Sequence, residues 1–292
     1  MRVWQLENDR YLVAVNATGA ELSRVRDKLA GREWLWQPQP DVWNNSATQL
    51  FPVVGALVHK GVRVDGHFLP LPSHGFLRAQ TFTCLEQSAK HLVLEARATP
   101  ETLVLWPWRW RVQLHLALHE DGLSLTQRVF NDDRQPFWYS IGWHPGFALP
   151  VASKRGWQVK FGEKAVRGPF PTRNRTLVTE GQTQTITAFP LTEASFRDGA
   201  IYFGDCQQQP ISVCSPDGTA VMTLETAEYD WLALWGVPGA DLLCIEPLAG
   251  TTDTPDFDGN AENKRGMRQL AAGESQSLGL RLRFAVDAWA AD

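Results

Sequence analysis

The chain has 292 residues, a formal net charge of −4 and a sequence pI near 6.0. Hydrophobic residues make up 43% of the chain, which is enough for a substantial core and excludes a disordered protein. The acidic balance, without any basic run, argues against a nucleic acid or an anionic membrane as the partner.

The cysteines and the apolar runs indicate the compartment. The four cysteines are scattered and form no C-x-x-C pair, so neither a zinc site nor a redox motif is predicted. Such isolated cysteines are typical of reduced, buried thiols and favour the cytoplasm. The first ten residues lack the apolar core of a signal peptide, and no run reaches the about 18 apolar residues that span a bilayer. We therefore expect a soluble cytoplasmic protein that does not bind membranes.

The first third of the chain predicts antiparallel hairpins. Residues 11–15 and 20–25 alternate as strands around a turn, and a second turn precedes residues 33–36. Residues 50–55 form a short apolar run broken by Pro52, which indicates an edge strand or a loop entering a cleft. Residues 62–71 predict another hairpin. His74 then follows on an irregular segment, the kind of segment where binding residues concentrate.

The clearest predicted strand runs from Leu103 to Leu118. Tryptophans and aliphatic residues occupy one face and polar residues the other, so one face should meet a core. On a strand, His115 and His119 lie about 13 Å apart and cannot share a metal ion. We interpret both histidines as residues of a solvated face.

The segment from Ser140 to Phe147 predicts a turn, because Pro145 and Gly146 should stop a strand there. This turn would present His144 between aromatic residues, with Trp143 as either a core residue or part of a binding cleft. Residues up to about 185 predict loops and short strands. Asp198 then precedes a further apolar run.

The last third of the chain continues the strand pattern. Residues 242–248 form an apolar strand that ends by presenting Glu246 just before Pro247, and residues 277–286 alternate as a final strand. Well over ten strand-like runs, no amphipathic helix of normal length and no linker predict an all-β chain. We expect a single large antiparallel β-sandwich domain over residues 1–292.

Taken one at a time, the candidate site residues have ordinary alternatives. Burial of Glu246 at the end of an apolar strand would raise its pKa toward that of a useful general base, but a salt bridge to an arginine fits equally well. His144 and His74 could simply hydrogen-bond to backbone, and Asp198 could be a turn residue. No nucleotide-binding loop and no serine-nucleophile motif is present.

Five segments together are more specific than any one of these residues. They are Leu50-Phe-Pro-Val-Val-Gly55, His74-Gly-Phe-Leu-Arg78, Gly142-Trp-His-Pro-Gly-Phe147, Phe196-Arg-Asp-Gly-Ala200 and Cys244-Ile-Glu-Pro-Leu-Ala-Gly250. In this order the segments resemble the aldose 1-epimerase (galactose mutarotase) family, and most of all its LacX-like branch. The resemblance implies a galactose mutarotase-like β-supersandwich. It also implies an isomerase that needs no metal or cofactor and interconverts the α and β anomers of an aldohexose.

The resemblance also assigns roles. It implies Glu246 as the general base for the C1 hydroxyl and His144 as the general acid for the ring oxygen. It implies that His74 and Asp198 contact the sugar, and we expect Arg78 and Trp143 to contribute to sugar binding as well.

Two positions depart from the family pattern. Many relatives carry an arginine where this chain has Ala56 and a tryptophan where it has Leu248. Both departures concern the grip on the substrate and therefore leave the identity of the sugar open.

Three alternatives remain open. A hexose 6-phosphate could be the substrate, with Arg78 or the arginines of residues 173–175 binding phosphate. The chain could be a non-catalytic sugar-binding protein that retains the cleft. Glycoside hydrolysis by Asp198 and Glu246 would use a carboxylate pair but would leave the histidines without a role.

Overall fold

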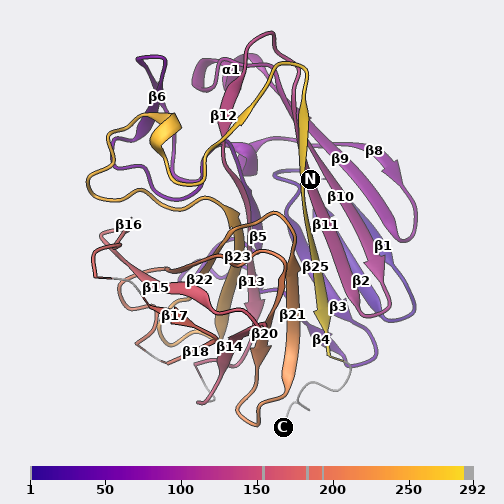
Figure 1. Cartoon of the computed structure of the whole chain (residues 1–292). Coiled ribbons are helices and arrows are strands. Elements are labelled where there is room, and N and C mark those ends of the chain that lie inside the picture. The colour runs from indigo at the N-terminus through magenta and orange to yellow at the C-terminus, as the bar shows by residue number, and fades with distance from the viewer. Residues whose placement is uncertain (1, 153–154, 182–183, 193, 286–292) are drawn as a thin grey trace.

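The computed structural model of this protein describes residues 2–152, 155–181, 184–192 and 194–285. Over these residues the chain is almost entirely β-structure, and its large sheets are antiparallel, which confirms the predicted fold class (Figure 1). No helix in the described ranges is long and apolar enough to cross a bilayer.

A nine-stranded sheet forms one layer of the sandwich, with the order β18-β14-β20-β21-β25-β11-β10-β9-β8. Its strands are β8 (Thr83–Gln87), β9 (His91–Arg97), β10 (Trp110–His119), β11 (Gly122–Asn131), β14 (Gln158–Phe161), β18 (Ala188–Pro190), β20 (Gln209–Cys214), β21 (Ala220–Thr226) and β25 (Ser275–Phe284).

Two sheets pack on one face of this layer. The eight-stranded sheet contains β5 (Ala47–Leu50), β13 (Ile141–Ala148), β15 (Val166–Arg173), β16 (Thr176–Leu177), β17 (Thr185–Ile186), β19 (Ile201–Gly204), β22 (Trp231–Trp235) and β23 (Leu242–Ala249). The four-stranded sheet contains β1 (Val3–Glu7), β2 (Tyr11–Asn16), β3 (Leu22–Asp27) and β4 (Arg32–Glu33). Two small ribbons complete the fold, β6 (Gly61–Val64) with β7 (His67–Pro70) and β12 (Phe137–Tyr139) with β24 (Arg268–Leu270).

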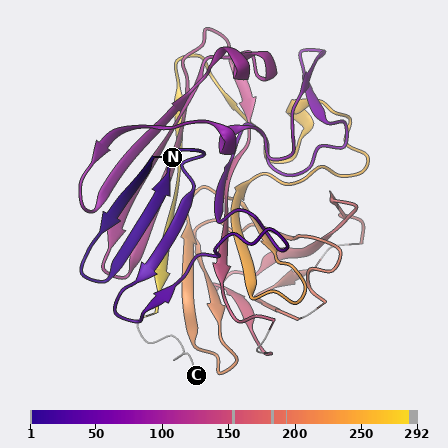
Figure 2. The same ribbon diagram turned by 180° about the vertical axis from the view of Figure 1, so that it is seen from behind.

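Aromatic contacts join the layers. Trp34, just after β4, stacks on Phe284 of β25 with ring centroids 4.4 Å apart. Phe161 of β14 meets Phe203 of β19 at 5.0 Å. The nine-stranded sheet is thus covered along one part by the N-terminal strands and along another by the eight-stranded sheet, as Figure 2 shows from behind. The inward side chains form one continuous apolar core.

The predicted hairpins of the first third are confirmed, with β2 paired to β3 and β6 paired to β7. Leu50 ends β5, the last strand at one edge of its sheet, and residues 51–55 follow it as a loop, as their proline-broken pattern predicted. The predicted final strand corresponds to β25, and Val286 lies outside the described residues.

The predicted strand from Leu103 to Leu118 is wrong at its start. Residues Pro100–Leu105 form the short helix α1, and the strand β10 begins only at Trp110. Pro100 stands at the first helical position, and the Thr99 side chain caps the helix by accepting from the Thr102 amide. These local signals outweigh the alternation of the tryptophans. Two single 3₁₀ turns, η1 (Leu77–Ala79) and η2 (Ala261–Asn263), are the other helical segments described.

Candidate active site

His144 lies in the middle of strand β13 and not on a turn, so that sequence prediction is wrong. Pro145 and Gly146 have other functions. The ladder between β13 and β23 is interrupted from Trp143 to Pro145, where proline offers no N–H to bond. A Cβ atom at Gly146 would lie 2.6 Å from the Trp43 ring, so glycine leaves room for that ring over the strand.

This interruption brings His144 opposite Glu246. Gly142 pairs with Leu248 and Gly146 with Cys244, so the register puts residues 144 and 246 level on neighbouring strands. His144 Nε2 lies 3.4 Å from Glu246 Oε1, and the two side chains are 12% and 3% exposed. On its other side Glu246 is level with Ala233 of β22, a residue with a small side chain.

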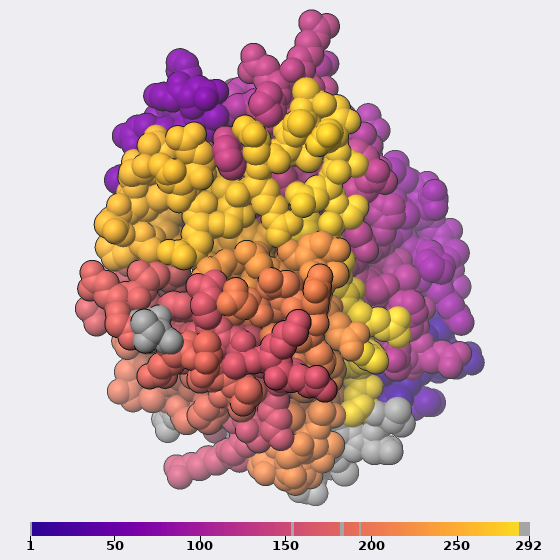
Figure 3. All heavy atoms as spheres, in the orientation of Figure 1, coloured from indigo at the N-terminus to yellow at the C-terminus, as the bar shows by residue number. Residues whose placement is uncertain are grey.

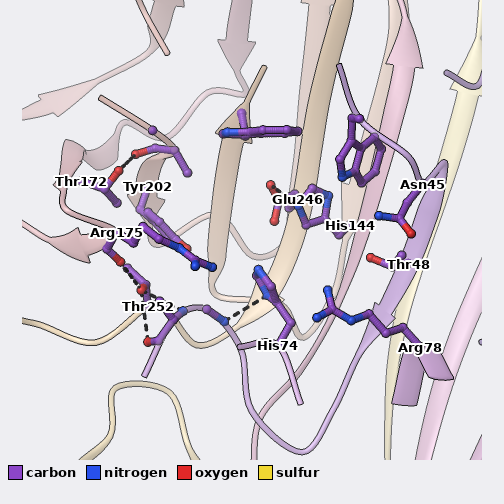
Figure 4. A pocket seen from close by; sticks show the side chains of 16 residues that line it. Asn45, Thr48, His74, Arg78, His144, Thr172, Arg175, Tyr202, Glu246 and Thr252 are labelled. Carbon is purple, nitrogen blue, oxygen red and sulfur yellow. Dashed lines mark hydrogen bonds and ion pairs between the residues drawn. The ribbon is translucent and has the colours of Figure 1, made fainter. Parts of the chain in front are cut away.

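The pair opens into a cavity of about 390 Å³. That volume is within the range of about 300–1,000 Å³ that is usual for small-molecule sites. In Figure 4, Asn45, Thr48 and Arg78 lie on one side of the pair, Thr172, Arg175, Tyr202 and Thr252 on the other, and His74 lies below. Polar groups therefore surround two titratable side chains at the centre.

Burial shifts both central groups toward their uncharged forms. Loss of solvent raises the pKa of Glu246 well above its usual value of 4.5. The same effect lowers the pKa of His144 from 6.5 to about 4, and the charge of Arg78 adds to it. These shifts favour the pair with the proton on Glu246 and a neutral imidazole on His144. Transfer of that proton across the 3.4 Å contact gives the carboxylate and imidazolium form. A pair with this property can take a proton at one atom and release one at another.

His74 has a fixed tautomer and orientation. The Gly55 amide donates to its Nδ1 at 3.2 Å, so the neutral ring carries its proton on Nε2. Its backbone has φ +65°, a conformation supported by the following Gly75, whose missing Cβ allows contact with the Phe51 carbonyl. Burial and the neighbouring His144 lower the pKa of His74 well below 6.5. The two histidine rings meet edge to face, with centroids 5.7 Å apart.

The structure corrects the expectation that Trp143 contacts the ligand. Successive residues of a strand point to opposite faces, so Trp143 faces the core when His144 faces the cavity. Its side chain is completely buried. The aromatic walls are Trp43, stacked on His144 with centroids 5.0 Å apart, and Trp235, whose edge-to-face contact with His144 spans 6.0 Å.

Of the remaining predicted site residues, Arg78 lines the cavity and Asp198 does not. Arg78 lines the cavity, and its Nη2 donates to the Ser73 carbonyl at 3.2 Å. Asp198 has an exposed side chain that does not line the cavity, although the next two residues, Gly199 and Ala200, do. Ala56 also lines the cavity, whereas Leu248 is buried in an apolar cluster beside it.

Several residues that line the cavity were not predicted from the sequence, because no motif marks them as site residues. They are Trp43, Asn45, Thr48, Thr172, Tyr202, Trp235 and Thr252. Trp43 stands out only as a tryptophan inside a polar turn. Arg175, one of the arginines that the sequence suggests as phosphate ligands, does line the cavity. Among the described residues, no group of three or more His, Cys, Asp or Glu side chains could hold a metal ion.

The chain is similar to known proteins over almost its whole length. The family model of aldose 1-epimerase matches residues 2–283. Protein LacX of Lactococcus lactis subsp. lactis is 22% identical over 279 residues, which cover 89% of this chain and 92% of LacX.

Two solved structures have the same fold. A galactose mutarotase related enzyme from Lactobacillus acidophilus superposes with a TM-score of 0.91 at 24% identity, covering 97% of each chain. A galactose mutarotase-like protein from Lactobacillus casei gives a TM-score of 0.87 at 23% identity, covering 97% of this chain and 100% of the other.

Proposed function

Because this chain belongs to the aldose 1-epimerase family, we propose that it interconverts the α and β anomers of an aldohexose. The observation that carries the proposal is the placement of His144 Nε2 3.4 Å from Glu246 Oε1 at the floor of the polar cavity. Anomerisation needs one group that accepts a proton and one that donates a proton, and this pair supplies both.

Ring opening begins with Glu246 as carboxylate and His144 as imidazolium, one of the two forms of the singly protonated pair. Glu246 takes the proton of the C1 hydroxyl, and the O–H electron pair becomes the second bond of a C1 carbonyl group. The bond between C1 and the ring oxygen breaks, and the ring oxygen receives the proton of His144. Both catalytic side chains are now uncharged, which is the form that their burial favours.

Ring closure reverses these transfers. The carbonyl group rotates about the C1–C2 bond and presents its other face to the freed hydroxyl. His144 takes that hydroxyl's proton as the oxygen attacks C1, and Glu246 returns a proton to the C1 oxygen. The product is the opposite anomer, and the pair regains its starting protonation.

The surrounding residues would hold the sugar during this cycle. His74 offers an Nε2–H donor, fixed by the Gly55 amide on its other nitrogen. The Trp43 and Trp235 rings supply apolar faces suited to the C–H faces of a pyranose. Asp198 remains a predicted sugar ligand at the rim, and its position outside the cavity lining gives no support to a hydrolytic carboxylate pair with Glu246.

The test is polarimetric or NMR mutarotation of several aldohexoses by the wild type, Glu246→Gln and His144→Asn. We expect each substitution to lower kcat by about 10²–10⁴-fold, the usual contribution of a positioned acid or base. Circular dichroism should show an unchanged fold. Wild-type rates in both variants would overturn the mechanism. Sugar binding without any wild-type acceleration would identify a binding protein instead.

One observation favours a second candidate substrate, an aldohexose 6-phosphate. Arg78 and Arg175 reach the cavity from opposite sides of His74, as Figure 4 shows, and both are tethered to Ser73. Among the described residues neither guanidinium pairs with a carboxylate, and Glu246 is the one acidic residue in the lining. Guanidinium groups that are not paired with a carboxylate can donate hydrogen bonds to the oxygens of a phosphate group in the cavity.

The same assay separates the two substrates. If phosphate binds here, kcat/KM should favour the 6-phosphate, and Arg175→Gln should reduce that preference about tenfold or more, the value of a charged hydrogen bond. Equal kcat/KM values for the free and phosphorylated sugar would exclude the phosphate candidate.

A further inference from the structure

A completely buried ion pair lies behind the cavity wall. Lys264 Nζ donates to Asp253 Oδ1 at 2.6 Å, with the side chains 1% and 0% exposed. The ammonium group also donates to the Thr251 carbonyl at 2.9 Å. Neither residue lines the cavity, so neither can touch a sugar there.

Asp253 joins this pair to the loop after β5. Its Oδ2 accepts from the Val58 amide at 2.9 Å, and its own amide donates to the Ala56 carbonyl at 3.2 Å. The neighbouring Thr252 accepts from the Ala56 amide at 3.0 Å. These three hydrogen bonds hold residues 56–58 against the segment that follows β23.

The same two residues hold the hairpin that carries Arg175. Thr252 Oγ1 donates to the Arg175 carbonyl at 2.6 Å, and the Leu177 amide donates to the Asp253 carbonyl at 2.8 Å. In Figure 3 the yellow residues of the C-terminal part lie directly against the salmon residues of this hairpin. Asn174 and Arg175, with φ +50° and +66°, form the two-residue turn of this hairpin, so these contacts fix where the turn lies over the cavity.

Glycines allow these backbones to approach. A Cβ at Gly55 would lie 2.3 Å from Thr252 Cα, and a Cβ at Gly266 would lie 2.3 Å from Gly250 Cα. Residues 55–58, 250–253 and 264–266 thus pack backbone to backbone, with the ion pair in their midst.

We propose that the Lys264–Asp253 pair is a positioning device for substrate binding, which fixes His74 and Arg175 through the wall formed by residues 55–58 and 252. The path to His74 is direct, because the Gly55 amide that orients its ring belongs to that wall. His144 and Glu246 stand outside the path, on β13 and β23. This inference rests on the proposed function only where its test measures kcat and KM.

The chemistry of burial supports a positioning role. Removing two charges from water is costly, and apolar replacements of buried ion pairs are often neutral or stabilising. Stability alone therefore gives little reason for a lysine at this place. The pair does give the wall a defined geometry. The Asp253 carboxylate accepts from the Val58 amide, and the Lys264 ammonium group holds both that carboxylate and the Thr251 carbonyl.

The experiment compares two double variants that both remove the charges. Asp253→Asn with Lys264→Met keeps an amide oxygen for the Val58 N–H, whereas Asp253→Leu with Lys264→Met keeps none. We expect the first to raise KM about threefold, because the cation that holds Asp253 and Thr251 is lost. The second should raise KM about tenfold or more, because the hydrogen bond to the Val58 amide is lost as well. Both double variants should keep kcat within about threefold of the wild type. The dependence of kcat on pH should also be unchanged, because neither variant alters His144 or Glu246.

A spectroscopic readout makes the test independent of activity. Nitrogen-15 NMR of the wild type should show His74 with its proton on Nε2, and the double variant with Asp253→Leu should weaken that preference. Arg10→Met, which breaks an ion pair with Asp27 in the N-terminal sheet, is the control for general destabilisation. Equal KM and equal His74 spectra in both double variants, or a KM that follows Tm across all three, would overturn the proposal. A wild type without mutarotation but with the expected His74 response would refute the function and leave the positioning intact.

Discussion

At the scale of single residues, strand parity decides which tryptophan meets the ligand. His144 faces the cavity, so its neighbour Trp143 faces the core, and Trp43 from the loop before β5 covers the imidazole instead. The two tryptophans should therefore fail in different ways when they are truncated.

We predict that Trp43→Ala lowers kcat/KM about tenfold or more with a small change in Tm, because it removes a partly exposed wall of the cavity. Trp143→Ala should instead cost about 3–5 kcal/mol of unfolding free energy, as for a buried tryptophan. Urea unfolding and polarimetry measure both effects. A large stability loss with Trp43→Ala and none with Trp143→Ala would contradict the assignment.

Sequence reasoning reached the two central residues of the cavity but not the walls around them. Glu246 and His144 were identified by resemblance, since their own patterns fitted ordinary roles equally well. Trp43 was missed because its function depends on Gly146, on a distant part of the chain, leaving room for its ring. Contacts of that kind arise from the fold and have no local signal.

At the scale of elements, local chemistry predicted the hairpins, since their turns are encoded by adjacent residues such as Asp65 and Gly66. It misassigned residues 140–147, because the pairing of β13 with β5 overrides the turn preference of Pro145 and Gly146. It also missed α1, because the tryptophans continue an alternation that only the Thr99 cap interrupts.

Two glycines with the same backbone angle test the packing of the wall. Gly55 and Gly66 both have φ +79°, but a Cβ at Gly55 would strike Thr252, whereas one at Gly66 would meet nothing within 4 Å. We predict that Gly66→Ala costs about 1 kcal/mol through backbone strain alone. Gly55→Ala should cost clearly more and should also raise KM, because it displaces the amide that orients His74.

Tm and KM, measured for both glycine variants, give the comparison. Equal stability losses, or a Gly55→Ala variant with wild-type KM, would show that the wall tolerates a shift.

At the scale of the whole molecule, the buried carboxyl group of Glu246 should lower stability at neutral pH. The folded pKa of Glu246 is raised above its unfolded value near 4.5, so its stabilising contribution is complete below that pH and is lost as pH rises through the folded pKa. Glutamine cannot ionise, so Glu246→Gln removes this loss of folding stability at neutral and alkaline pH.

We predict that Glu246→Gln raises Tm relative to wild type at pH 8 and changes it little at pH 4, while lowering kcat about 10²–10⁴-fold. Calorimetry across this pH range measures the difference. A Tm difference that is independent of pH, or that grows toward acid, would mean that Glu246 is not held in its protonated form by burial.

The proposed proton-transfer pair lies on two neighbouring strands, which separates the proposed chemistry from the choice of substrate. His144 and Glu246 belong to the rigid interior of one sheet, whereas Trp43, His74, Arg175 and Thr252 come from four connections around its rim. Mutations in those connections can change the accepted sugar one contact at a time without rebuilding the acid and the base. The fold is thus a favourable starting point for evolving or engineering new sugar specificities.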